Sequence, residues 1–251
     1  MFSLRNGKTD GMSAPRTARE RVKDEVTSEI LSAARAHLAR EGAAALSLRS
    51  IARDLGMAPS ALYRYFSSRD ALLSALILGA YGSLADQAEH ASEAAYGQQD
   101  GALARWVAVP RAMRSWARSH PHEWGLIFGS PVPGYEAPTE TITPYTRLAL
   151  ALVRPIIEAH RNGSLRLDPP SAPSSASPGT DPLARSVQPV AEGLLPGLPT
   201  VAVARALQAF ATLIGLISLE LFGHWRNTVL EPEVLFEATI SHLASSTGVC
   251  P

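Results

Sequence analysis

The sequence predicts an all-α protein, with a small N-terminal domain of three helices in a helix-turn-helix arrangement and a larger helical domain behind it. Apolar residues recur at helical spacing along most of the 251 residues, and glycine or proline interrupts the pattern at intervals of a helix length. Residues 46–70 read as a short helix, a turn and a second short helix. The expected parts are a flexible basic arm at 1–21, the helix-turn-helix at 22–70 and the second domain at 71–251.

The arm holds five basic residues among glycine, serine and proline, a composition typical of a flexible segment. It either lies along the phosphates or the minor groove of a nucleic acid, or remains a solvated tail. The first helix is expected from Val22 to Glu41, because apolar residues from Val26 to Leu38 follow an i, i+4 stripe and Gly42 then acts as a stop signal.

The two short helices have clear local boundaries. Ser47 can cap the first, which should run from Leu48 to Leu55, and Gly56 can end it in the left-handed conformation. Pro59 suits the first turn of the next helix, where its missing N–H is harmless. A second helix after such a turn is the one that enters the major groove in helix-turn-helix proteins.

The residue types of the second helix fit that position. Ser60 and Ala61 are small enough for a close approach to base edges, and Ala61 could touch a thymine methyl group. Tyr63, Arg64 and Tyr65 offer hydroxyl and guanidinium groups to phosphates or bases. The alternative is that the tyrosines pack the small domain, and one of the two is expected to point partly inward.

The next helix should begin after Ser67-Ser68-Arg69-Asp70, which reads as a capping box of a serine followed three residues later by an acid. Arg69 is a further candidate for a phosphate contact. Leu73, Leu76 and Ile77 begin the apolar face of this helix.

From about Thr27 to Tyr81 the chain resembles the TetR family of transcriptional regulators. The matching motifs are Ile30-Leu31 with Ala34, Glu41-Gly42, Leu46-Ser47, Ile51-Ala52, Leu55-Gly56, Ala61-Leu62-Tyr63-Arg64-Tyr65-Phe66, and Arg69 with Leu72-Leu73. The resemblance implies DNA contacts at the matching positions. Arg64 is added to these positions because of its side-chain chemistry. The expected DNA-binding residues are therefore Ser47, Arg49, Pro59, Ser60, Ala61, Tyr63, Arg64, Tyr65 and Arg69. Ala58 departs from the Ser or Thr that many members place there as a helix cap.

Composition agrees with this reading. Lys and Arg equal Asp and Glu at 23 each, but residues 1–70 hold 12 basic and 8 acidic residues, so a basic head precedes an acidic body. The single cysteine, Cys250, allows no disulfide within the chain and no thiolate zinc site. Met1 to Gly11 lacks the apolar core of a signal peptide, and Met12 is an alternative start. A cytoplasmic protein with no membrane partner and no membrane span is expected.

The second domain should contain helices from Gly101 to His120, from His122 to Gly129 and from Thr141 to Asn162. Pro110 should kink the first of these helices or mark its restart, and Pro155 should bend the last. Residues 164–199 are rich in proline and serine and are expected to form a mobile loop.

Two helices, Val201–Gly223 and Pro232–Ser245, close the chain. The first is apolar nearly all round, which predicts burial on several sides and favours contact with a second subunit. The segment from Trp116 to Tyr135 is similar to the regulatory domain of a TetR subgroup with a Trp-His-Gly signature. That resemblance implies a homodimer formed through these last two helices, bound to a palindromic DNA operator and released by a small effector molecule.

The effector is expected to be apolar and to bind among aromatic side chains, although ordinary core packing is the competing interpretation for each of them. The candidates are Trp106, Trp116, Trp124, Phe128, Tyr145 and Trp225. His120 and His122 lack a third ligand at suitable spacing, so neither a metal nor a cofactor is expected. An enzyme is not expected, since no Gly-x-Ser-x-Gly elbow, phosphate-binding glycine loop or paired carboxylates occur. A membrane-surface role for Val201–Gly223 lacks the flanking basic clusters it would need.

Overall fold

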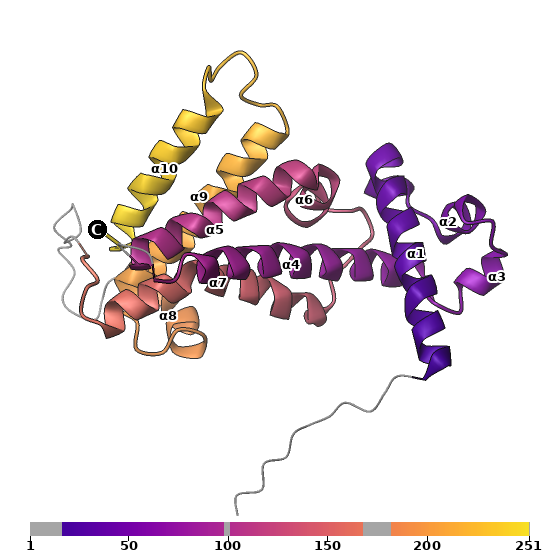
Figure 1. Cartoon of the computed structure of the whole chain (residues 1–251), viewed down its shortest axis with the longest axis horizontal. Helices are drawn as coiled ribbons and strands as arrows, with labels where there is room; N and C mark the ends of the chain where they lie inside the picture. The colour runs from indigo at the N-terminus through magenta and orange to yellow at the C-terminus, as the bar shows by residue number, and fades with distance from the viewer. Residues whose placement is uncertain (1–16, 98–100, 168–181, 251) are drawn as a thin grey trace, which may run out of the picture.

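In the computed structural model, which describes residues 17–97, 101–167 and 182–250, every regular element is a helix, as the sequence predicts. A small head and a larger body lie at opposite ends of one long helix, α4 (Figure 1). The head elements are α1 (Ala18–Glu41), η1 (Ala43–Ala45), α2 (Leu48–Asp54) and α3 (Pro59–Leu62). The others are α4 (Arg69–Ala94), α5 (Gly101–Ser119), α6 (Pro121–Phe128), η2 (Thr139–Thr141), α7 (Ile142–Arg161), α8 (Pro182–Gly193), α9 (Thr200–Leu221) and α10 (Pro232–Ser246).

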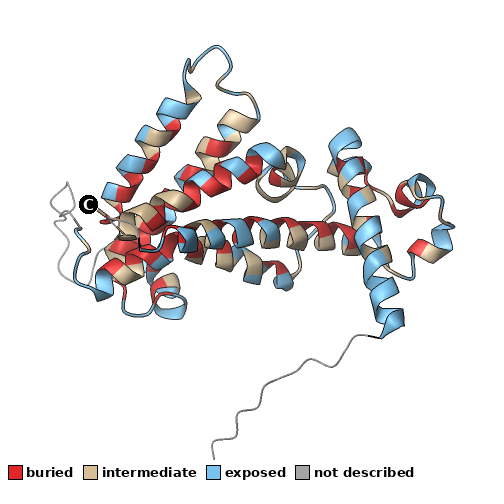
Figure 2. Cartoon of the chain, viewed as in Figure 1, coloured by how far each residue is buried: buried red, intermediate tan, exposed pale blue. Residues whose placement is uncertain are grey.

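Helix α4 belongs to both hydrophobic cores. Its first turns bury Leu73 and Leu76 among head residues, and its later turns bury Leu84 and Ala88 in the body. Figure 2 shows buried residues along α4 from the head into the body. Because a helix is stiff along its axis, a displacement of the body end of α4 would also displace the head.

The cap of α4 differs from the predicted one by a single residue. Ser68, not Ser67, is the N-cap, and its hydroxyl accepts a hydrogen bond of 3.0 Å from the N–H of Ala71. The predicted Ser67–Asp70 capping box is therefore wrong, because Ser68 provides the same cap one residue later.

Helix α1 begins earlier than the sequence analysis places it. Thr17 and Glu20 form a reciprocal capping box, so Ala18–Arg21 is helical rather than part of a flexible arm. The expected boundary between residues 21 and 22 is wrong for this reason, while residues 1–16 of the expected arm lie outside the described residues. At the other end, the N–H of Gly42 bonds to the carbonyl of Leu38, 3.0 Å away, which agrees with the predicted stop.

The body helices agree with the predicted periodicity. The residues expected to point inward from α7, namely Leu148, Leu152, Ile156 and Ala159, are all buried. Pro110 and Pro155 lie inside α5 and α7, and neither helix is interrupted there. The free energy gained by burying the apolar faces of α5 and α7 in the body core exceeds the cost of the one backbone hydrogen bond that each proline removes.

The expected mobile loop at 164–199 is wrong for its second half, which contains α8. Val187 and Ala191 of this helix and Leu195 and Leu198 after it are buried in the body core. Val187, Ala191 and Leu195 recur at i, i+4, i+8 spacing, so α8 can pack one face against α9 even though Pro189 lies inside it. Residues 168–181 lie outside the described residues.

The closing helices α9 and α10 have nearly the predicted bounds. Helices α4 and α9 are long and apolar enough to cross a membrane by length and composition, with mean hydropathies of 1.2 and 1.7. In both helices about half of the apolar window is buried inside the protein, at 44% and 50%, so the core packing of a folded domain accounts for their composition.

Candidate nucleic-acid interface

Helix α3 presents one side to solvent and anchors the other in the head. Leu62 is fully buried and Phe66 is 7% exposed, which holds the segment on the core. Pro59, Ser60 and Arg64 are exposed. The helix is only four residues long, but hydrogen bonds from Tyr63 N–H to the carbonyl of Pro59 (3.2 Å) and from Phe66 N–H to that of Leu62 (3.1 Å) extend its turn.

The two tyrosines divide between the surface and the core. Tyr63 is 49% exposed, while Tyr65 is half-buried and packs against the head core. This confirms the prediction that one of them points partly inward. Ala61 is half-buried and forms part of the same outer surface.

Helix α2 adds a cap residue and a cation. The hydroxyl of Ser47 accepts a hydrogen bond of 3.1 Å from the N–H of Ser50, so the predicted cap of α2 is confirmed. Arg49, in the first turn of α2, is exposed. Asp54, at the end of α2, is 3.0 Å from the guanidinium of Arg40, so a cation balances its charge.

Arg69 has an internal role that the sequence analysis did not foresee. Its Nε donates to the carbonyl of Leu46 and its Nη2 to the carbonyl of Ala43, both at 3.0 Å. The guanidinium therefore fastens the start of α4 to the segment that leads into α2. Its phosphate contact stays a prediction.

Two further cations lie beside α3. Arg19 and Lys23 of α1, together with Arg64 and Tyr65, line a surface hollow of about 590 Å³. Arg19 was expected in the flexible arm, and Lys23 was not among the expected DNA-binding residues. The missed signal is the Thr17–Glu20 capping box, because a helix that starts at Ala18 puts residues 19 and 23 on one face.

The head and the body meet along α6 and the loop after it. Arg35 of α1 pairs with Glu123 of α6 at 2.8 Å, and Ser74 of α4 is hydrogen-bonded to Tyr135 at 3.0 Å. Leu126 also packs against the head core. A shift of α6 relative to α4 would therefore change the position of the head.

The structure does not bring the six expected effector residues together. Trp106, Trp116 and Trp124 are core residues with at most 1% exposure. The indole N–H groups of Trp116 and Trp124 donate to Ser83 and Ser218, each at 3.0 Å. Burial on all sides favours core packing for these three, the competing interpretation of the sequence.

The other three expected effector residues occupy different places. Phe128 of α6 packs on Trp124 with ring centroids 4.6 Å apart. Tyr145 of α7 is 40% exposed and lines an apolar groove between α7, α8 and α9. Trp225 is half-buried in the connection between α9 and α10.

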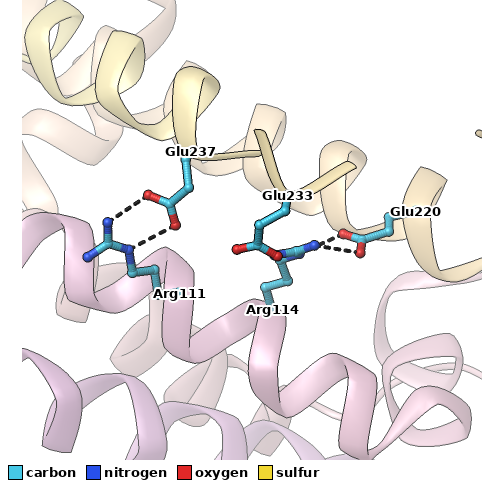
Figure 3. A network of polar contacts seen from close by, with 5 residues as sticks. All are labelled: Arg111, Arg114, Glu220, Glu233 and Glu237. Atoms are coloured by element: carbon cyan, nitrogen blue, oxygen red, sulfur yellow. Dashed lines mark hydrogen bonds and ion pairs between the residues drawn. The ribbon is translucent and has the colours of Figure 1, made fainter. Parts of the chain in front are cut away.

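Two arginines, one turn apart on α5, hold the hairpin formed by α9 and α10 (Figure 3). Arg114 is buried and donates two hydrogen bonds to Glu220 of α9, at 2.7 and 2.8 Å, and a third to Glu233 of α10. Arg111 makes a two-pronged pair with Glu237 at 3.0 and 2.6 Å. Hydrogen bonding to Glu220 and Glu233 raises the pKa of Arg114. Hydrogen bonding to Arg111 lowers the pKa of Glu237.

The described residues hold no group of three or more His, Cys, Asp or Glu side chains that could bind a metal ion.

Comparison with known proteins covers both parts of the chain. Residues 30–76 match the family of bacterial regulatory proteins called tetR, and residues 106–243 match the tetracyclin repressor-like C-terminal domain. The chain is 37% identical over 226 residues to HTH-type transcriptional regulator Rv1816 of Mycobacterium tuberculosis, with 88% of this chain and 91% of that protein covered.

Solved structures agree in fold. The regulatory protein SCO4313 aligns with a TM-score of 0.72 at 32% identity, covering 91% of this chain and 100% of that one. A protein of unknown function from Rhodococcus sp. RHA1 aligns with a TM-score of 0.63 at 25% identity, covering 88% and 94%.

Proposed function

Because this chain belongs to the TetR family, and is therefore a DNA-binding transcriptional regulator, we propose that it is a ligand-responsive repressor that binds a palindromic operator as a homodimer. The proposal includes the cytoplasm as its location, where bacterial DNA lies. The observation that carries the DNA-binding part is α3, which is anchored by buried Leu62 and Phe66 and exposes its polar side.

Helix α3 would enter the major groove with its first turn foremost. Ala58, Pro59, Ser60 and Ala61 are small, so the backbone can come close to the base edges. They offer little hydrogen bonding, and specificity would then depend on Arg49, the residues after α3 and the shape of the DNA.

Cations on three helices would provide most of the affinity. Arg49 of α2, Arg64 after α3 and Lys23 of α1 are exposed, and Lys23 and Arg64 line the same hollow. Contacts of this kind release counterions from DNA, so the affinity should fall steeply as the salt concentration rises. The half-sites of the operator should lie about 34–36 Å apart, one turn of DNA.

The proposed dimer uses the outer faces of α9 and α10. Leu219 of α9 and Val234 and Leu235 of α10 are exposed, at 38–59% of their surface. Exposed apolar side chains on two neighbouring helices support a four-helix bundle with a second copy. A stable interface of this kind buries about 800 Å² per partner.

The effector would act by favouring one dimer geometry over another. A ligand that binds two conformations equally shifts nothing, so the effector must contact residues whose positions differ between the DNA-bound and the released states. The contacts of α1 with α6 and of α4 with the loop after α6 support this mechanism, because the body meets the head there.

The test is a gel-shift titration of a DNA fragment from upstream of the protein's own gene, at several salt concentrations. Arg64→Ala should weaken binding by about 5- to 100-fold, and Tyr63→Phe by about 2- to 10-fold through loss of one hydrogen bond. Arg185→Ala, which removes an exposed cation from α8 at the end of the body away from the head (Figure 1), is the matched control and should bind normally. Normal binding by both head variants would exclude α3 as the recognition element.

The oligomeric state and the sign of regulation need separate measurements. Sedimentation should give a dimer that Leu235→Glu dissociates. Deletion of the gene should raise expression from the bound promoter, and a fall would identify an activator instead.

A further inference from the structure

An apolar groove of about 250 Å³ lies between α7, α8 and α9. Ala149 and Val153 of α7 form one side, and Ala206 and Phe210 of α9 form the other. Leu195, just after α8, lies at one end. The groove exists because α8, in a segment that the sequence predicts to be a loop, packs against α9 beside the contact between α7 and α9.

The lining selects the chemistry of an occupant. None of the lining residues carries a charge, and the polar side chains among them are Tyr145 and Thr146. A charged molecule would lose its hydration there without gaining an ionic partner. The volume corresponds to about eight water-sized groups of roughly 30 Å³ each, which suits a medium-length alkyl chain with a hydroxyl or carbonyl group at one end.

Tyr145 connects the groove to the long helix. Its ring packs edge-on against Phe210 on the groove side and against Tyr81 of α4, with centroids 5.8 Å apart in both pairs. A molecule that fills the space beside Phe210 must therefore either contact the Tyr145 ring or displace it.

Tyr81 passes the contact on to α6. Its hydroxyl donates to the carbonyl of Ile127 at 3.1 Å, and its ring packs edge-on against Phe128 at 5.7 Å. Ile127 packs against both the body core and the head core. A continuous set of side-chain contacts therefore runs from the groove, through Tyr145 and Tyr81, to the junction between body and head.

We propose that this groove is the effector site, that it takes an uncharged molecule with a medium-length alkyl chain, and that the ligand changes DNA binding by altering the contact between Tyr145 and Tyr81. The inference rests on the proposed ligand response. In this site the aromatic residues that contact the ligand are Tyr145 and Phe210, and the buried tryptophans do not contact it.

Binding is tested with 1-decanol on the full-length protein, by thermal shift and by displacement of a fluorescent apolar dye. Decanol at tenfold its Kd should raise Tm by about 3–5 °C, and decanoate at the same concentration should do less. Ala149→Phe, which fills the groove, should abolish the shift. Leu150→Gln, a milder change in the same lining, should weaken decanol several-fold.

Thr143→Phe is the matched control, since it adds the same ring to an exposed position of α7 outside the groove, and it should bind decanol normally. No shift in the wild type, or an equal shift in Ala149→Phe, would overturn the site. Dissociation of the dimer by Ala149→Phe would show that the groove is a subunit interface and would also overturn it.

Coupling is tested with Tyr145→Leu, which keeps an apolar lining but removes the ring contacts. Decanol should change the operator affinity of the wild type by about 5- to 150-fold. The variant should still bind decanol, but its operator affinity should be the same with and without decanol. If the variant still responds fully, the Tyr145–Tyr81 contact is not the link. Failure of the wild type to bind DNA at all would refute the proposed function, whereas the thermal shift tests the groove independently.

Discussion

Replacing Arg114 with methionine should destabilise the protein far more than the same replacement of Arg111. The two arginines lie one turn apart on α5 and each makes a two-pronged pair with a glutamate, but the Arg114 side chain is 8% exposed and that of Arg111 is 58% exposed. Glu220, the main partner of Arg114, is 19% exposed. Burial therefore separates the two pairs, and Arg114 has a second, exposed partner in Glu233.

The magnitudes follow from that difference. Removing one partner of a buried ion pair leaves the other charge unpaired and costs about 3–5 kcal/mol. We expect roughly 2–4 kcal/mol for Arg114→Met, because Glu220 keeps some contact with water. An exposed pair contributes only about 0–1 kcal/mol, which is the expected cost of Arg111→Met.

The assay is urea unfolding of both single variants and of Arg114→Met with Glu220→Leu. The double variant should recover most of the lost free energy, since replacing a buried pair with apolar residues is often nearly neutral. Equal losses for Arg111→Met and Arg114→Met, or no recovery in the double variant, would refute the argument that burial of the charge sets the cost.

Three further outcomes are expected. Arg111 lowers the pKa of Glu237 below its usual 4.5. The ion pair should therefore stabilise the fold above about pH 4.5 and lose this effect as the pH falls through the lowered pKa. Glu237→Gln should differ from the wild type in the free energy of unfolding at pH 7 but not at pH 2. Burial, aided by Tyr145, raises the pKa of Tyr81 to about 12, so tyrosinate absorbance should show a phenol that titrates near pH 12 and that Tyr81→Phe removes. The contribution of the neutral Tyr81 phenol to stability should be lost as the pH rises from 10 towards 12. Arg69→Ala should lower the free energy of unfolding by about 1–3 kcal/mol through its two bonds to backbone carbonyls; an unchanged Tm with weaker DNA binding would instead support a phosphate contact alone.

The head could be predicted closely because its signals are local. Ser47 caps α2, Gly56 adopts a φ of 64° after it, and Pro59 opens α3, each acting within one turn of its own position. The apolar spacing of α7 likewise placed its buried face correctly. The start of α1 was the exception, because the Thr17 cap lies five residues before Val22, where the helix was expected to begin.

The candidate effector site could not be predicted in this way. The tryptophans are aromatic and numerous, but whether an aromatic side chain lines a cavity or fills the core depends on which helices surround it. Trp124 meets Ser218, which is 94 residues away, and Tyr145 meets Tyr81 across two helices. Helix α8 was missed because proline content predicts a loop unless a partner surface stabilises the helix.

By itself, the sequence determined the all-helical fold, the helix-turn-helix and its family, because capping, glycine turns and apolar periodicity act between residues that are close along the chain. Only the tertiary structure decided that Arg69 holds α4 to the segment before α2, that Tyr63 rather than Tyr65 is exposed, that Arg114 is buried against Glu220, and that an apolar groove opens beside Tyr145. These features depend on contacts between residues that are distant along the chain, and only the packing of whole helices determines which of those contacts form.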